Sequence, residues 1–205
     1  EGTESECILC YNPRDIEKLE KFMKDKPVSE REIGAQLLFE TSSYAESAQC
    51  RRKLLLHYFG ESFEDNQCNK MCDNCRHPKE KFDVSSELSK MLDLIQKIGT
   101  DFNIKHITDI VLGVKSKEVT DYEHHKLDSF GMGSNKDAKF WKSVIRLGIV
   151  DGLIIKDIER YGLLSVSDKG REYIKNPSPV EIAMDQDFER INEEDFESAS
   201  ASACL

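Results

Sequence analysis

The sequence predicts a mainly α-helical fold with a small β component. Most segments carry apolar side chains that recur every three or four residues, which is typical of amphipathic helices. Two β-rich runs, residues 149–155 and 163–166, are joined by a short polar segment and predict a hairpin. Between the early and the late helices lies a cluster of four cysteines: Cys50, Cys68, Cys72 and Cys75.

The first 60 residues predict one strand and three helices. A short apolar run, residues 7–11, predicts the strand. The helices are recognised by apolar residues at helical spacing and by residues that typically begin or end a helix. These signals are Asn12 and Pro13 at the start of the first helix, Ser29 with Glu32 as a capping box on the second, and Gly60 at the end of the third.

The spacing of the four cysteines predicts a metal site. Cys68, Cys72 and Cys75 lie within eight residues, and Cys50 stands at the N-terminal end of the third helix. Zinc binds four thiolates in a tetrahedron, and short spacings between cysteines suit its knuckle-like turns. An iron–sulfur cluster uses four cysteines as well and remains the rival interpretation. Three further cysteines argue against a secreted disulfide scaffold: Cys7, Cys10 and Cys204.

Basic residues lie close to these cysteines in the sequence. A zinc ion bound by four thiolates has a net charge of −2, which nearby cations partly offset. The same cations could instead contact phosphate, and the sequence leaves both interpretations open. The residues are Arg51, Arg52, Lys70 and Arg76.

Residues 83–175 have the order of elements expected of a winged helix-turn-helix domain, namely helices followed by a two-stranded hairpin. The segment before them, residues 77–86, has the composition of a linker. The predicted elements are a helix capped by Ser86 and ended by Gly99, helices over 104–112 and 116–130, a helix from Ser134 or Asn135 to Gly148, and a hairpin whose tip is 156–162.

The helix from residue 134 to 148 is the element expected to dock on DNA. Three lysines recur on it every third residue, and the free N–H groups of a helix N-terminus suit a phosphate oxygen. A solvated lysine face would show the same spacing. The predicted DNA contacts are Ser134, Asn135, Lys136, Lys139 and Lys142, with Arg160 and Tyr161 at the tip of the hairpin.

Charge and missing motifs narrow the possible functions. The net charge of −10 gives no support to nucleic-acid binding, but residues 176–205 alone carry −7 and predict an acidic, flexible linker. No Gly-rich phosphate loop and no nucleophile–base pair is present, so we expect neither ATP binding nor catalysis by these residues. His124 and His125 are adjacent and point in different directions on a helix, which favours structural or surface roles.

Five strings that occur in order resemble the region that follows the motor in RecQ-family DNA helicases. The strings lie between Ala45 and Gly170, and the resemblance covers about residues 10–175. The strings are AESAQCRRKLLLHYFGE, CNKMCDNC, HHKLDSFGMG, FWKSVIRLGIVDGLI and YGLLSVSDKG.

The resemblance implies a domain order and a set of cofactors. One structural zinc per chain would be held by the four clustered cysteines, although three residues instead of two separate Cys68 from Cys72. ATP and Mg²⁺ would belong to motor domains that lie outside this chain. The implied parts are the end of the second motor lobe (1–27), a helical zinc-binding subdomain (28–82), a winged-helix RQC domain (83–175) and an acidic linker towards a further domain (176–205).

The resemblance also implies an activity and partners. The full-length protein would be an ATP-dependent 3′–5′ helicase of DNA repair and recombination, in the bacterial cytoplasm at the nucleoid. It would bind duplex–single-strand junctions and forks, contact its own motor lobes and interact with a single-stranded-DNA-binding protein. Tyr161 stands where the family's wing can carry a residue that assists strand separation. Its ring would stack on an unpaired base, or else pack on the body of the domain.

Two other functions fit parts of the pattern. One is a free-standing winged-helix regulator with a zinc domain, which should also have a dimerisation helix with sustained heptads. The other is a protein-interaction module, which the near-neutral charge of residues 84–175 would permit.

Overall fold

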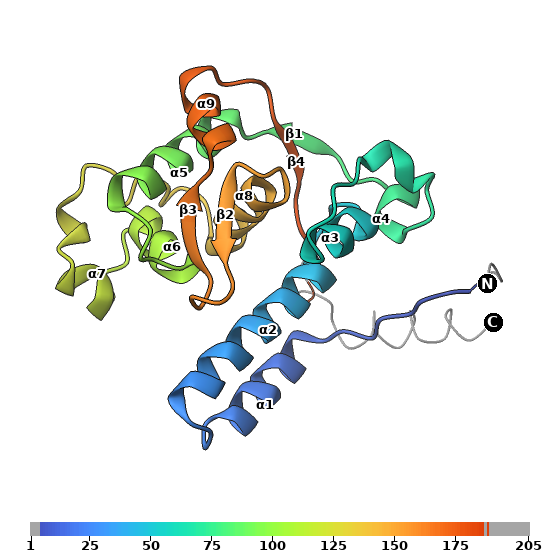
Figure 1. The fold of residues 1–205 in the computed structure, drawn as a ribbon, viewed down its shortest axis with the longest axis horizontal. Coiled ribbons are helices and arrows are strands. Elements are labelled where there is room, and N and C mark those ends of the chain that lie inside the picture. Colours follow the sequence, from blue (N-terminus) through green and yellow to red (C-terminus); the bar gives the residue numbers. More distant parts are fainter. Residues whose placement is uncertain (1–4, 187, 189–205) are drawn as a thin grey trace. The chain divides into compact units, whose positions relative to one another are not determined.

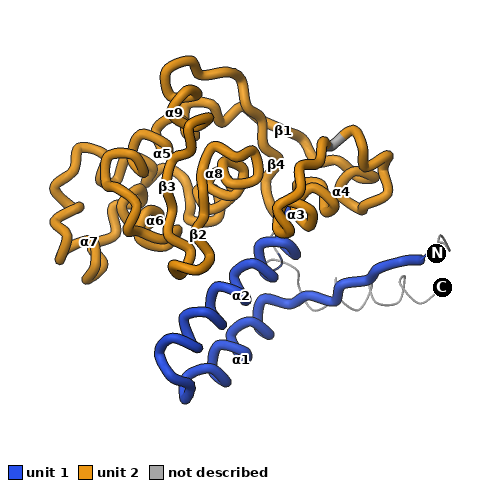
Figure 2. Tube along the Cα trace, viewed as in Figure 1, with its two compact units in different colours: residues 1–47, 186–205 blue, residues 48–185 orange. Residues whose placement is uncertain are grey.

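A computed structural model describes residues 5–186 and 188 and divides the chain into two compact units (Figure 2). The first unit comprises residues 1–47 and 186–205, and the second comprises residues 48–185. Most of the predicted acidic linker, and Cys204 with it, lies outside the described residues. Within the described part, no helix combines the length and the apolar character needed to cross a membrane.

The first unit contains two helices that pack against each other, α1 (Pro13–Met23) and α2 (Val28–Glu46). The predicted cap of α1 is confirmed, because the side chain of Asn12 accepts a hydrogen bond from the N–H of Arg14. The predicted capping box of α2 is wrong. The helix begins one residue before Ser29, after Pro27, and has no side-chain cap. The predicted strand over residues 7–11 is also wrong, because these residues are extended but pair with no other strand among the described residues.

The second unit begins with the short elements that carry the cysteines. They are α3 (Arg51–Tyr58), the 3₁₀ helix η1 (Asp65–Cys68) and α4 (Asp73–Arg76) (Figure 1). Gly60, which follows α3, has a φ of 79°, a conformation that glycine adopts without steric cost. The helix ends at Tyr58, two residues before Gly60, so the predicted end of the third helix is confirmed.

The rest of the second unit is a winged helix, as predicted. Helices α5, α6 and α8 surround a common core, and α5 and α8 also pack on the hairpin. Leu88, Ile107, Val144 and Leu164 are buried completely at this centre. The elements are α5 (Ser85–Ile98), α6 (Ile104–Leu112), α7 (Lys117–Asp121), the 3₁₀ helix η2 (His124–Lys126), α8 (Ala138–Val150), β2 (Ile154–Asp157), β3 (Leu163–Val166) and α9 (Asp168–Lys175).

Several predicted boundaries shift in this domain. The first strand of the hairpin begins at Ile154 instead of residue 149, because α8 continues through Gly148 to Val150. A Cβ atom at position 148 would lie 2.7 Å from Ile154, so glycine lets the hairpin pack closely on the helix. The segment 116–130 forms only the short helices α7 and η2. Ser86 does not cap α5, which begins at Ser85 after Val84.

A second pair of strands connects the two halves of the second unit. Strand β1 (Lys81–Asp83) pairs antiparallel with β4 (Glu181–Ala183), and Phe82 lies opposite Ile182. Figure 1 shows this ribbon between the cysteine-bearing helices and the winged helix. The predictions of a linker over residues 77–86 and of a flexible linker from residue 176 are therefore wrong where these strands form. Their apolar side chains explain the pairing, since Ile182 is buried and Phe82 stacks near Phe140 at 6.2 Å.

Candidate zinc centre and nucleic-acid interface

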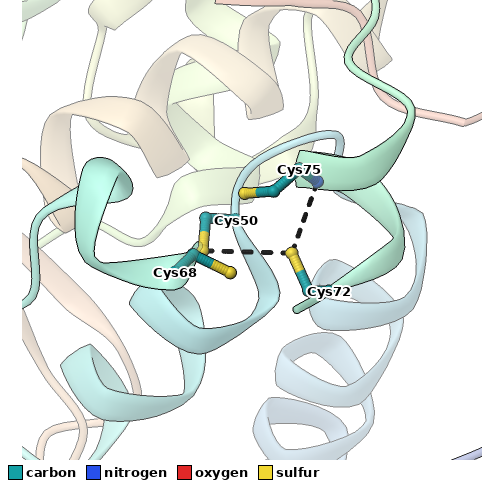
Figure 3. Close-up of side chains that lie close together, drawn as sticks. All are labelled: Cys50, Cys68, Cys72 and Cys75. Atoms are coloured by element: carbon teal, nitrogen blue, oxygen red, sulfur yellow. Dashed lines mark hydrogen bonds between the residues drawn. The ribbon is translucent and has the colours of Figure 1, made fainter. Parts of the chain in front are cut away.

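The four clustered cysteines converge on one point (Figure 3). Their sulfur atoms all lie within 4.8 Å of one another. Each thiol is placed by the end of a short helix. Cys50 precedes α3, Cys68 ends η1, Cys72 is the N-cap of α4 and Cys75 lies inside α4. The sequence-predicted set is thus brought together in full.

The geometry of the cluster fits a tetrahedral zinc ion. Zn–S bonds of about 2.3 Å place the sulfurs of such a site about 3.8 Å apart. The Sγ atoms of Cys50 and Cys72 are 4.0 Å apart. Cys50 and Cys68 are buried, so the site is closed on that side. The backbone N–H of Cys75 donates to the Cys72 sulfur at 3.4 Å, the kind of contact that stabilises a thiolate.

The thiols differ in how easily they ionise. Burial acts to raise the pKa of Cys68, but hydrogen bonds from the Cys72 backbone and the neighbouring thiols bring this pKa down to about 7. Burial raises the pKa of Cys50, and burial together with the neighbouring thiols raises the pKa of Cys75. Burial and the neighbouring thiols thus disfavour the ionised forms of Cys50 and Cys75. A divalent cation would supply the charge that allows all four to ionise.

Two of the nearby arginines hold the cysteine segment together. The guanidinium of Arg51 binds the carboxylate of Asp73 through two nitrogens at 3.1 Å and, despite the partial burial of Asp73, lowers the pKa of this carboxyl. Arg76 donates to the backbone oxygen of Met71 at 3.2 Å. These contacts connect α3 to α4 and close the turn between Cys68 and Cys72. Arg52 lies beside the sulfur of Met71 on the exposed side of the same turn.

The N-terminus of α8 differs from the prediction. The cap is Asp137, whose carboxylate accepts a hydrogen bond from the N–H of Phe140 at 2.8 Å. Ser134 and Asn135 therefore precede the helix and do not cap it. The carboxylate of Asp137 occupies the position that was predicted for a phosphate, and a negative charge there disfavours a second anion.

The three predicted lysines are divided between α8 and the turn before it. Lys139 and Lys142 lie on α8, three residues apart and partly exposed. Lys136 lies in the preceding turn, with its Nζ 5.2 Å from the centre of the Phe140 ring. The structure thus keeps two lysines on one helix face and places the third beside the start of that helix.

The hairpin presents Tyr161 and Arg160 at its tip. Tyr161 has a φ of +59°, is 44% exposed and precedes β3, which begins at Leu163. The N–H of Arg160 donates to the Asp157 side chain, and its guanidinium pairs with Asp101 at 3.1 Å. The ion pair therefore connects the tip to the loop before α6, and the hydrogen bond to Asp157 fixes the conformation of the tip.

Sequence reasoning missed a pair of histidines, of which His106 is buried and His124 is half-buried. Nε2 of His106 lies 2.8 Å from Nδ1 of His124, and Nδ1 of His106 lies 3.1 Å from the carboxylate of Glu118. Burial lowers the pKa of both histidines. The adjacent pair that the sequence draws attention to is thus not the pair that interacts. The position of His106 four residues before Ile110 on the same helix is a sequence signal that it faces the core.

A second missed cluster surrounds Asp185. Its carboxylate accepts from the backbone N–H of Ala48 at 3.2 Å and from the hydroxyl of Ser143, and it pairs with Arg146. Both charged side chains are 13% exposed. The cluster joins the start of the cysteine segment, α8 and the residues after β4. Nothing local in the sequence marks it, because its members are up to 137 positions apart.

Comparison with known proteins identifies two successive domains. The family described as RecQ zinc-binding matches residues 13–76, and the RQC domain matches residues 78–190, more than half of the chain. The chain is 32% identical to the ATP-dependent DNA helicase RecQ of Haemophilus influenzae, covering 88% of this chain and 29% of that protein. It is 27% identical to the ATP-dependent DNA helicase RecQ of Bacillus subtilis, over 88% of this chain and 30% of that protein. It is 28% identical to the ATP-dependent helicase SGS1 of Saccharomyces cerevisiae, over 85% of this chain and 12% of that protein. The chain thus spans less than a third of the length of these relatives.

Proposed function

Because this chain belongs to the RQC domain family and carries the RecQ zinc-binding domain before it, we propose that it is the DNA-binding accessory region of an ATP-dependent 3′–5′ RecQ-type DNA helicase. The observation that carries the proposal is the order of the parts, a four-thiol centre followed by a winged helix with a defined hairpin tip. The complete protein would act in DNA repair and recombination.

The zinc centre has a structural role in this proposal. Cys50, Cys68, Cys72 and Cys75 are the four ligands, and four protein ligands leave no open position for a substrate. The bound zinc supplies the positive charge that keeps the thiolates ionised. The chain's own short helices then hold the ligands in place, with Arg51 and Asp73 connecting two of them.

The winged helix is the DNA-binding part. Lys139 and Lys142 on α8 and Lys136 before it contact phosphates, with Ser134 and Asn135 in the same turn. Tyr161 at the tip of the hairpin stacks on the base that is exposed where the duplex opens. Arg160 positions this tip through its pair with Asp101.

The remaining assignments follow from the same proposal. Residues 1–27 end the second motor lobe, 28–82 form the zinc-binding subdomain, 83–175 form the RQC domain and the residues from 176 lead to a further domain. ATP and Mg²⁺ bind in motor domains outside this chain. The partners are forked and junction DNA, the motor lobes and a single-stranded-DNA-binding protein. The location is the bacterial cytoplasm, at the nucleoid.

Binding to a duplex–single-strand junction tests the DNA-binding role. We expect weak binding that falls steeply with salt, because each phosphate contact releases counterions and contributes about −0.9 to the slope of log K against log[salt] on duplex DNA. Fluorescence anisotropy with a labelled fork at several salt concentrations measures this slope. The triple variant Lys136→Ala/Lys139→Ala/Lys142→Ala should have a smaller slope. An affinity that does not change with salt would contradict the proposal.

Metal analysis tests the structural centre. We expect one zinc and no iron per purified chain, and local unfolding of residues 50–76 when a chelator removes the metal, because binding energy in such sites is also folding energy. Elemental analysis and hydrogen exchange measure these two outcomes. Iron with a brown colour would establish the rival cluster instead.

A further inference from the structure

A cleft with many polar side chains lies within residues 48–183, on the side of the second unit that carries the cysteines. It has a volume of about 590 Å³. Its walls come from the start of α3, the turns around the cysteines, the β1–β4 ribbon and the end of α8, all of which Figure 1 labels except the turns. The winged-helix residues assigned to DNA above are not among the residues that line it.

The cleft is rich in lysine although the chain as a whole is acidic. Two carboxylates also line it, but Asp151 is paired with Lys53 at 2.8 Å, which leaves Glu181. The side chains of Lys70 and Lys81 form no hydrogen bond or ion pair with any described residue, although the backbone of Lys81 pairs in the β1–β4 ribbon. The lysines of the lining are Lys53, Lys70, Lys79 and Lys81.

Amide side chains complete the polar lining. Asn66 and Asn69 come from the turns around Cys68, and Asn74 donates to the backbone oxygen of Gln49 at 2.7 Å. Amide and ammonium groups both donate hydrogen bonds to phosphate oxygens. None of the described residues that line the cleft is aromatic, so the cleft offers no platform for stacking bases. These side chains suit contacts to the phosphates of a nucleic-acid strand and not stacking contacts to its bases.

We propose that this cleft holds phosphate groups of a nucleic-acid strand, as a second contact separate from the winged-helix face. The ammonium groups of Lys70 and Lys81 bind the phosphates directly, since neither is paired with another described residue. Lys53 is held by Asp151 and shapes the wall. Because the contact is made to phosphate, it is independent of sequence and adds to the salt dependence of binding.

The double variant Lys70→Ala/Lys81→Ala tests this contact. A labelled single-stranded oligonucleotide is titrated onto the zinc-loaded chain at several salt concentrations. We expect the slope of log K against log[salt] to become less steep by about 1.4, because each phosphate contact to a single strand contributes about 0.7. The matched control is Lys90→Ala/Lys97→Ala, which removes the same charge from the exposed face of α5 and should leave the slope unchanged.

Two measurements separate this proposal from its alternatives. If the lysines only offset the charge of the thiolates, the double variant loses zinc while the slope of the zinc-loaded protein stays the same, and the proposal fails.

Acetylation of lysines, measured by mass spectrometry, should slow at Lys70 and Lys81 when the oligonucleotide is bound, and stay unchanged at Lys90 and Lys97. If inorganic phosphate at the same concentration of phosphate groups slowed acetylation of Lys70 and Lys81 equally, the cleft would be a site for free anions only, and the proposal would fail. Because the probe is single-stranded, failure of the winged-helix proposal on duplex junctions would leave these outcomes unaffected.

Discussion

Tyr161 has a backbone conformation that is costly for a residue with a side chain. Its φ of +59° lies in the left-handed region, where a non-glycine residue loses about 1–2 kcal/mol. The next residue, Gly162, has a φ of 75°, so the turn requires two consecutive residues of this kind. A ring at the first of these positions lowers stability, and a contribution to strand separation would explain its presence.

Replacing Tyr161 separates stability from function. Tyr161→Gly should raise the free energy of unfolding by about 1 kcal/mol, because glycine accepts this backbone conformation. In the full-length helicase that we propose, the same change should lower DNA unwinding several-fold and leave DNA-stimulated ATP hydrolysis nearly unchanged. Urea unfolding of this chain and unwinding assays on the full-length protein measure the two effects.

Tyr161→Phe is the control, because it keeps the ring and should preserve unwinding. If Tyr161→Gly reduced unwinding and ATP hydrolysis equally, a role for the ring in strand separation would be excluded.

Helix α8 shows how a helix start can be misplaced by sequence alone. Ser134, Asn135 and Asp137 are all good N-cap residues, and they lie within four positions. The choice depends on a tertiary contact, since the indole N–H of Trp141 donates to the backbone oxygen of Gly133 at 2.9 Å. A Cβ atom at position 133 would lie 2.3 Å from this ring, so glycine lets the preceding turn pack against the helix.

Changes at Asp137 test the cap and the charge separately. Asp137→Ala should lower the free energy of unfolding by about 1 kcal/mol, the usual cost of losing an N-cap. Asp137→Asn keeps an acceptor for the Phe140 N–H and should retain most of the stability. It also removes a negative charge near the proposed phosphate contacts, so DNA affinity should rise.

Urea unfolding and anisotropy titration of the same proteins measure both effects. Equal destabilisation by the two substitutions would show that the charge of Asp137, and not its hydrogen bond, stabilises the helix.

The elements that the sequence predicted well are those with local signals. The cysteine centre was recognised because three of its members lie within eight residues, and α6 because a periodic apolar segment precedes Gly113. The β1–β4 pairing could not be predicted from the sequence, because three-residue strands about 100 positions apart carry no local pattern of their own. The pairing depends on the burial of Ile182, which only the fold decides.

At the scale of the whole second unit, Asp185 connects segments from its two ends. The carboxylate joins Ala48, Ser143 and Arg146, and it is almost enclosed. Removing one member of a buried charge pair leaves the other charge without compensation, which is costly. The unit therefore depends on a residue that lies beyond its last helix.

Asp185→Ala should lower the free energy of unfolding of the zinc-loaded chain by about 3 kcal/mol. The control Asp101→Ala removes an exposed ion pair with Arg160 and should cost less than about 1 kcal/mol. Urea unfolding followed by circular dichroism measures both values. A loss at Asp185 no greater than that at Asp101 would contradict the structural role of the cluster.

The β1–β4 ribbon has a mechanical consequence. A single connecting peptide would let the winged helix rotate freely about its bonds, whereas two hydrogen-bonded strands resist twisting and bending. A force applied to the winged helix is therefore shared by a chain segment that enters the domain and one that leaves it. The ribbon thus makes the connection between the cysteine segment and the winged helix stiffer than a single peptide would.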